Sequence, residues 1–181
     1  MQIILFILSL WSVSSPLTQP KIYTTNTGTI RFRSEAPMEL IHAVSKEVKG
    51  AVDVDKKTFA FRIRINSFEG FNSPLQREHF NENYMETPKF PEALFNGKII
   101  EDVDLSQTGT YTVRAKGILT IHGVSKERII KSDVEVKNGM MKIKSNFTVL
   151  LSDHNIPIPR VVKEKLANEI VVELLAELNQ K

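Results

Sequence analysis

The sequence predicts an all-β fold with one or two short helices, built as an antiparallel sheet that closes on itself or stacks on a second sheet. Apolar and polar residues alternate with period two through most of the chain. Turn residues such as Asn138-Gly139 separate the alternating runs, and the stretch 71–95 is the main interruption. Because alternation describes a barrel and a sandwich equally well, it leaves these two architectures open.

Residues 1–18 are expected to be a secretory signal peptide. Residues 3–11 are apolar apart from one serine, small serines follow, and the first charge is Lys21. The apolar run is about half of the ~20 residues that a membrane-spanning helix needs, so a cleaved signal is favoured over a membrane anchor. We therefore expect a periplasmic or secreted protein without a stable membrane anchor after cleavage, with residues 19–181 as one domain.

Composition and charge exclude several kinds of site. The chain has no cysteine, which rules out a thiolate nucleophile and a disulfide framework. The formal net charge is +3, spread along the chain without a run of Lys or Arg. Arg62 and Arg64 on one expected strand, and Lys142 and Lys144 on another, are typical of a solvated outer face. Nucleic-acid binding would need a concentrated basic patch, so no nucleic-acid partner is expected.

The first strands are predicted from alternation and from turn residues. A strand over 30–33 follows a turn at Gly28, and a second over 40–48 ends at Gly50. Residues 48–65 form a hairpin through a turn at 55–57. Its second strand has the clearest alternation in the sequence, with one face formed by Phe59, Phe61, Ile63 and Ile65.

One short helix is predicted where the alternation stops. The stretch 73–76, Ser-Pro-Leu-Gln, combines an N-cap serine, a proline at the first helical position and a glutamine placed for a capping box. The helix should run to about Met85, because Pro88 pushes the residue before it out of the α region. Phe80 and Tyr84 are four residues apart, so they share one face and would lie against the β-structure.

After the helix, alternation resumes and predicts strands over 93–99, 111–121, 128–136 and 141–149. The strongest turn between them is Asn138-Gly139, the commonest two-residue hairpin sequence. Residues 160–167 are expected to be helical after Pro157 and Pro159. Residues 170–178 are assigned as the last strand, because Ile170 begins a β-branched run and a meander needs a closing partner.

Two motifs give the chain a resemblance to a known family. They are Lys89-Phe90-Pro91 after the helix and the decapeptide GILTIHGVSK over 117–126. Together with segments 30–34, 48–50, 61–67 and 152–154, they resemble the YceI-like family of lipid- or polyisoprenoid-binding proteins, in order along nearly the whole chain after residue 18.

The resemblance implies an eight-stranded antiparallel lipocalin-like β-barrel with an elongated apolar channel. It also implies export, as is general for the family in Gram-negative bacteria, and binding of an apolar lipid-like ligand such as a polyisoprenoid or isoprenoid quinone without catalysis. One place departs from the family. The place of the late motif Ser-Arg-x-Asp-Phe-Gly is taken by residues 150–159, in which the aspartate persists as Asp153 but the arginine and the glycine do not. The channel mouth near this loop is expected to differ, which leaves the identity of the ligand head group open.

A polyprenyl tail offers no hydrogen bonds, so its affinity would come from apolar area removed from water, roughly 25 cal/mol per Å² before ordering costs. The residues expected to line a channel are the inward sets of the strands and the aromatic face of the helix. These are Ile30, Phe32, Phe59, Phe61, Ile63, Ile65, Phe80, Tyr84, Phe95, Val113, Leu119, Ile121, Phe147 and Val149. The same pattern also describes a filled core, because a small barrel is packed by its own side chains.

No catalytic, metal or cofactor motif stands out in the sequence. The four histidines lack metal-ligand spacing, and HExxH, a Gly-x-Ser-x-Gly elbow and a Gly-rich phosphate loop are missing. His122 is expected to be a structural histidine at a turn.

The alternative to a carrier is a filled-barrel scaffold, a stress-response or adhesion module that binds a protein partner through its outer surface. Cavity volume separates the two, and the sequence leaves the oligomeric state open.

Overall fold

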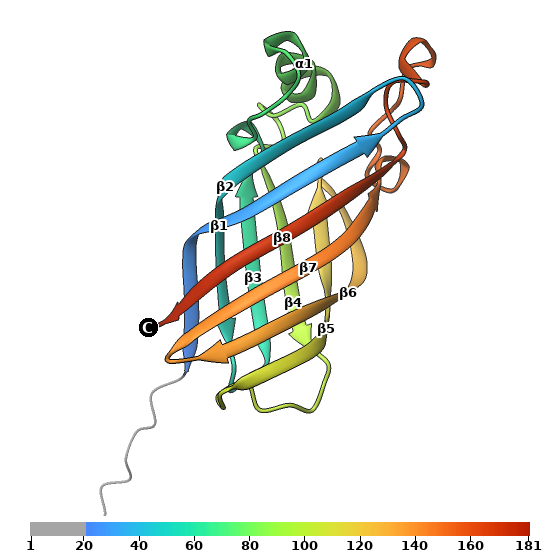
Figure 1. Cartoon of the computed structure of the whole chain (residues 1–181). Helices are drawn as coiled ribbons and strands as arrows, with labels where there is room; N and C mark the ends of the chain where they lie inside the picture. Colours follow the sequence, from blue (N-terminus) through green and yellow to red (C-terminus); the bar gives the residue numbers. More distant parts are fainter. Residues whose placement is uncertain (1–20) are drawn as a thin grey trace, which may run out of the picture.

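The computed structural model describes residues 21–181, so the signal peptide predicted over 1–18 lies outside the described residues. Eight strands form one closed antiparallel barrel in which each strand pairs with the next and β8 pairs back with β1 (Figure 1). Of the two architectures that alternation allows, the chain therefore adopts the barrel. The strands are β1 (Ile22–Glu35), β2 (Leu40–Asp53), β3 (Thr58–Arg64), β4 (Glu92–Ile99), β5 (Gly109–Ile121), β6 (Val124–Lys137), β7 (Met140–Leu150) and β8 (Glu169–Gln180).

Alternation places apolar residues inside the barrel and charges outside it. On β3, Phe59 and Ile63 are buried, whereas Arg62 and Arg64 are exposed. Arg62 pairs with Glu92 of β4 at 3.6 Å across the outer surface. Such exposed pairs contribute little stability, and they confirm that these arginines belong to a solvated face.

Two tight hairpins follow from residues that tolerate positive φ. Asn138 and Gly139 have φ of 53° and 73° between β6 and β7, as the sequence predicts, and His122 and Gly123 have 51° and 70° between β5 and β6. Positive φ at both central residues defines a type I′ turn, whose twist matches that of the strands it joins.

Two glycines were wrongly predicted as strand ends. Gly28 lies inside β1 at a register irregularity, and β2 continues through Gly50 to Asp53. A Cβ at Gly28 would lie 3.1 Å from the Cβ of Val48, and one at Gly50 would lie 2.2 Å from the Phe61 ring. Glycine at these positions allows a bulge and close packing, which is its other common role in strands.

The predicted helix forms as two consecutive pieces, α1 (Pro74–His79) and a π-helical segment, η2 (Phe80–Tyr84). Ser73 is the N-cap, and its Oγ accepts a hydrogen bond from the Gln76 N–H at 3.2 Å. The capping box differs in one bond, because Gln76 Oε1 accepts from the N–H of Asn72, not from that of Ser73. The helix lies at one end of the barrel (Figure 1).

The helix predicted over 160–167 is wrong, because only a 3₁₀ turn, η4 (Arg160–Val162), forms and is followed by irregular turns. A helix this short needs to bury an apolar face to offset the free-energy cost of its nucleation, and here Val161 is 89% exposed.

The remaining short turns are η1 (Ile65–Ser67) and η3 (Leu151–His154). Among residues 21–181, no helix combines the length and apolar character needed to cross a bilayer.

Candidate ligand-binding channel

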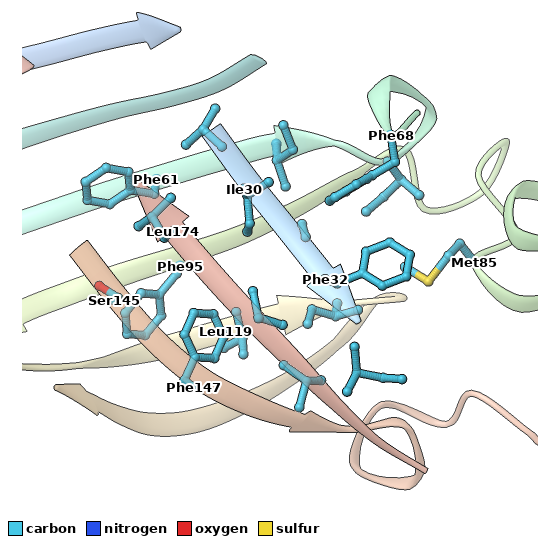
Figure 2. Close-up of a pocket in the computed structure, with 18 of the residues that line it drawn as sticks. Ile30, Phe32, Phe61, Phe68, Met85, Phe95, Leu119, Ser145, Phe147 and Leu174 are labelled. Carbon is cyan, nitrogen blue, oxygen red and sulfur yellow. The ribbon is translucent and has the colours of Figure 1, made fainter. Parts of the chain in front are cut away.

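A cavity of about 570 Å³ lies inside the barrel, and all eight strands contribute residues to its wall. Figure 2 shows apolar side chains from several strands around this space, among them Ile30, Phe61 and Phe95. The structure places all the residues predicted to line a channel on this wall: Ile30, Phe32, Phe59, Phe61, Ile63, Ile65, Phe80, Tyr84, Phe95, Val113, Leu119, Ile121, Phe147 and Val149. Their contact with a ligand stays a prediction.

The cavity exists because small residues occupy several inward positions between the large ones. Ala93, Ala115, Ser132 and Ser145 all border it. An eight-stranded barrel is just wide enough to be filled by its own side chains or to hold one small ligand. Alanine and serine at these inward positions leave space that the aromatic and aliphatic residues do not fill.

One end of the cavity is closed by the connection from β4 to β5. Leu105 of this connection is 3% exposed, borders the cavity and packs in a buried cluster with Val52, Phe59 and Val113. In Figure 1 the connection lies at the opposite end of the barrel from α1. A ligand would therefore reach the cavity from the α1 end.

Four phenylalanine rings pack together at the α1 end of the cavity. Phe32 stacks on Phe80 with a centroid distance of 5.4 Å, Phe68 lies 5.3 Å from Phe32, and Phe71 lies 5.1 Å from Phe80. Phe32 and Phe80 were predicted as lining residues. Phe68 and Phe71 were missed because they lie between β3 and α1, where no regular period marks an inward face.

The mouth of the cavity lies where α1, the β1–β2 loop and the segment 160–166 meet. Leu75, His79 and Lys165 border the cavity and are exposed to solvent. Leu75 and His79 belong to α1, and Lys165 belongs to the segment 160–166. Glu39 of the β1–β2 loop borders the cavity as well. Of these four, Leu75 alone is apolar, so three of the polar side chains that border the cavity lie at its opening.

Hydrogen bonds connect the three segments of the mouth. Gln76 of α1 donates from Nε2 to Glu39 Oε1 at 2.9 Å, and the Met38 N–H donates to the Glu164 carbonyl at 2.8 Å. The β1–β2 loop therefore joins α1 on one side to the segment 160–166 on the other.

The deeper part of the cavity offers few groups for chemistry. Ser132 and Ser145 face each other on β6 and β7 with their hydroxyl oxygens 2.7 Å apart, so one hydroxyl donates a hydrogen bond to the other. The titratable side chains that border the cavity are Glu39, Arg62, His79, Tyr84 and Lys165. Burial raises the pKa of the Tyr84 hydroxyl, which keeps it protonated at neutral pH. Residues 21–181 contain no group of three or more His, Asp or Glu that could hold a metal ion.

The two motifs that carry the family resemblance meet beside the channel. The Phe90 ring packs edge-on against the His122 ring with centroids 4.6 Å apart. His122 Nε2 lies 2.9 Å from Glu86 Oε2, and its Nδ1 lies 3.1 Å from the His154 carbonyl oxygen. Both ring nitrogens have partners, so His122 is a structural histidine, as predicted. It fixes the segment after η2 against the β5–β6 turn and η3.

We expect this junction to weaken in acid. Hydrogen bonds from Lys89 and, next, from His122 lower the pKa of Glu86 below its ordinary value of 4.5. A lowered carboxyl pKa gives stability that is present above the ordinary pKa and is lost as the pH falls through the folded-state pKa. Glu86→Gln should therefore lower the urea midpoint at pH 6, and the difference from the wild type should shrink at pH 3.

The control for this prediction is Glu82→Gln, which removes an exposed carboxylate from η2. It should leave the wild-type pH profile of the urea midpoint unchanged. A gap between the wild type and Glu86→Gln that is as large at pH 3 as at pH 6 would contradict the assignment.

Many wall residues were not predicted, although the period-two rule extends to most of them. The missed residues of the strands include Ile41, Val48, Val52, Ile99, Ile130, Val134, Met141, Ile143, Ile170, Val172 and Leu174. On β4, β6, β7 and β8 these residues have the parity of the inward set, so strand pairing would have found them. On β2 an extra residue near Lys46 and Glu47 changes the inward parity from odd at Ile41 to even at Val48 and Val52, which alternation alone does not predict. Met85, Leu105 and Ile156 lie outside the strands, where alternation gives no signal.

Comparison with known proteins adds to this geometry. The sequence matches the model of the YceI-like domain over residues 23–178. The chain belongs to the YceI-like domain family. This agrees with the resemblance carried by the motifs at 89–91 and 117–126. Comparison with curated protein sequences gave no match.

Solved structures with this fold come from several bacteria. A polyisoprenoid binding domain from Saccharophagus degradans implicated in plant cell wall breakdown has 13% identity and a TM-score of 0.75, covering 90% of this chain and 100% of that one. BcnA of Burkholderia cenocepacia has 14% identity and a TM-score of 0.70, covering 83% and 95%. The Campylobacter jejuni YceI protein has 14% identity and a TM-score of 0.58, covering 97% and 94%. At these identities the likeness shows the fold.

The structure explains the departure from the family's late motif. Asn155, where YceI-like proteins often carry glycine, has φ of 54°, a left-handed conformation that asparagine tolerates. His154, at the place of the family's phenylalanine, is fully buried. Asn155 therefore forms a left-handed turn at this place, and Leu151 and Ile156 on either side of it border the cavity.

Proposed function

We propose that this YceI-like protein is an exported binding protein that holds a long apolar ligand in the barrel channel without catalysis. A polyisoprenoid or an isoprenoid quinone is the ligand class that fits best. The observation that carries the proposal is the cavity of about 570 Å³, closed at the Leu105 end and walled mainly by aliphatic and aromatic side chains.

The volume favours a carrier over a filled scaffold. Ligand sites usually measure about 300–1,000 Å³, and a barrel packed by its own side chains would leave far less. The solved polyisoprenoid binding domain with the same fold supports the choice of ligand class. The apolar run and serines of residues 1–18 support export.

The physical chemistry of the wall suits a branched hydrocarbon chain. Each buried methylene contributes about 0.8 kcal/mol, so one five-carbon isoprene unit contributes on the order of 3–4 kcal/mol before ordering costs. A few units inside the cavity are enough for tight binding. The polar head group would stay at the mouth, where Glu39, His79 and Lys165 border the opening.

The absence of catalysis in this proposal rests on where the reactive groups lie. Glu39, His79 and Lys165 are at the mouth, away from the apolar interior, and Ser132 and Ser145 are hydrogen-bonded to each other without a neighbouring base. A nucleophile needs a base within hydrogen-bond reach. The wall therefore supplies apolar contact area and a matching shape, and the ligand is released chemically unchanged.

Titration with a fluorescent polyprenyl analogue delivered from cyclodextrin tests the proposed function. We expect saturable binding of one analogue per barrel, with an affinity that changes little between low and high salt because the contact is apolar. A lack of saturable binding by the folded protein would overturn the proposal.

The mass of the protein isolated from its host tests export, because cleavage removes residues 1–18 from the mass. Cleavage also removes Trp11, the only tryptophan of the sequence.

A further inference from the structure

The apolar side chains that are most exposed lie at the cavity mouth. Among the described residues, Val161 is 89% exposed and Met38 70%, followed by Leu75 at 56% and Leu40 at 55%. All four belong to segments that surround the opening at the α1 end. The remaining exposed apolar residues, such as Ile129 and Leu175, lie mostly on outer strand faces, and exposed apolar side chains of this kind are ordinary on a protein surface.

The two most exposed of these residues belong to loops that touch each other. The Met38 N–H donates to the Glu164 carbonyl at 2.8 Å, which joins the β1–β2 loop to the segment that carries Val161. Figure 1 shows these two loops side by side at one corner of the barrel end. We call Met38, Arg160, Val161 and Lys163 the rim patch.

The rim patch combines apolar tips with positive charge. Arg160 and Lys163 are exposed and make no ion pair among residues 21–181, whereas Arg62 and Arg64 on the barrel wall are paired with Glu92 and Glu47. The opposite side of the mouth differs in balance, because α1 and η2 carry the exposed acids Glu78 and Glu82 against the exposed Arg77, whereas the segment 160–166 carries three exposed cations against Glu164. The excess of positive charge therefore lies at one corner of the opening.

The rim patch continues directly into the cavity. Val162, Lys165 and Leu166 border the cavity, whereas Val161 between Arg160 and Val162 points to solvent. The same short segment thus forms the edge of the apolar channel on one side and an exposed apolar and basic surface on the other. A surface that docked here would lie at the channel opening.

We propose that the rim patch docks the protein on the surface of a bilayer that contains anionic lipid, with the channel mouth facing the membrane. Met38 and Val161 enter the interfacial region, and Arg160 and Lys163 lie at the level of the lipid phosphates. The biological purpose of this docking rests on the proposed function, because a docked channel mouth would let an apolar ligand pass between the bilayer and the channel without crossing water. The docking itself is independent of any bound ligand.

Cosedimentation with vesicles tests the docking. Vesicles of phosphatidylglycerol and phosphatidylcholine should bind the wild-type protein at low salt, and binding should weaken as salt rises. Arg160→Gln with Lys163→Gln should lower the partition coefficient roughly 25-fold, about fivefold for each charge. The matched control is Lys98→Gln with Lys131→Gln, which removes the same charge from the barrel wall and should change binding less than about twofold.

A second pair of variants tests the apolar part of the rim patch. Met38→Ser with Val161→Ser should lower vesicle binding on the order of tenfold. Ile129→Ser with Leu175→Ser removes two exposed apolar side chains from the wall and should have little effect. The polyprenyl analogue delivered from cyclodextrin should still bind all four variants, because none of these positions borders the cavity.

The outcomes separate this inference from the proposed function. If the wild type fails to bind anionic vesicles, or if the rim variants bind as the wild type does, the docking proposal is overturned while ligand binding from cyclodextrin still stands. If vesicles bind but the analogue does not, the docking surface stands and the carrier function falls. Equal loss in the rim and wall charge variants would show that net charge alone governs binding, which also overturns the proposal.

Discussion

Phe61→Arg should abolish binding of the apolar ligand while the barrel stays folded. Phe61 borders the cavity from β3 and points into it in Figure 2, with its ring packed over the backbone of Gly50. A guanidinium in this space either keeps its hydrating water, which then occupies the space of the hydrocarbon chain, or loses that water at a high cost in free energy. Either outcome disfavours binding of the hydrocarbon chain. We expect at least a hundredfold loss of affinity for the polyprenyl analogue, measured by fluorescence titration.

The control lies one residue away on the same strand. Ala60 faces outward between Ala51 and Asn96, so Ala60→Arg adds the same charge to the solvated wall and should leave affinity within about twofold of the wild type. If Phe61→Arg does not fold, Ala115→Trp fills the cavity without adding a charge and should also displace the ligand. A folded variant of either kind that binds the analogue at full affinity would exclude the cavity as the binding site.

Gly97→Ala should be among the most destabilising single substitutions in the barrel. Gly97 of β4 lies directly opposite Gly117 of β5. A Cβ at Gly97 would lie 2.1 Å from the Lys116 carbonyl oxygen and 2.5 Å from the Gly117 Cα. Because both obstacles are backbone, the two strands must separate, and we expect a loss of about 3 kcal/mol in the free energy of unfolding. Thermal unfolding should show a fall of roughly 6–12 °C in Tm.

Gly139→Ala separates crowding from backbone strain. Gly139 has φ of 73° and open space around its Cβ position, so alanine there suffers only the left-handed conformation, about 1 kcal/mol. Its Tm should fall by roughly 2–4 °C. Equal losses for the two variants would mean that β4 and β5 do not approach as closely as described.

The inward wall was predictable because period two is a local property of each strand. Phe59, Phe61 and Ile63 on β3 face the cavity as their parity requires. Closure of the sheet was not predictable from alternation, because it depends on the pairing of β1 with β8, such as Phe32 with Val172, which no local pattern encodes. Only the family resemblance supplied the barrel.

The mouth was harder to predict than the wall. Phe68 and Phe71 lie in irregular chain between β3 and α1, so their inward position follows from tertiary packing. The segment 160–167 has a helical composition, but only a 3₁₀ turn forms: Val162 and Leu166 border the cavity, whereas Val161 between Arg160 and Val162 stays exposed. Gly28 and Gly50 show a related ambiguity, because glycine marks turns and also sites of close approach within strands.

Native mass spectrometry of the protein purified from its own host, with lipid extraction of the same sample, tests the central claim most directly. The account predicts a stoichiometric apolar adduct that survives purification and is identified as an isoprenoid lipid in the extract. It also predicts that added polyprenyl ligand restores the adduct after delipidation. A mass of the polypeptide alone, unchanged after addition of polyprenyl ligand, would contradict the account.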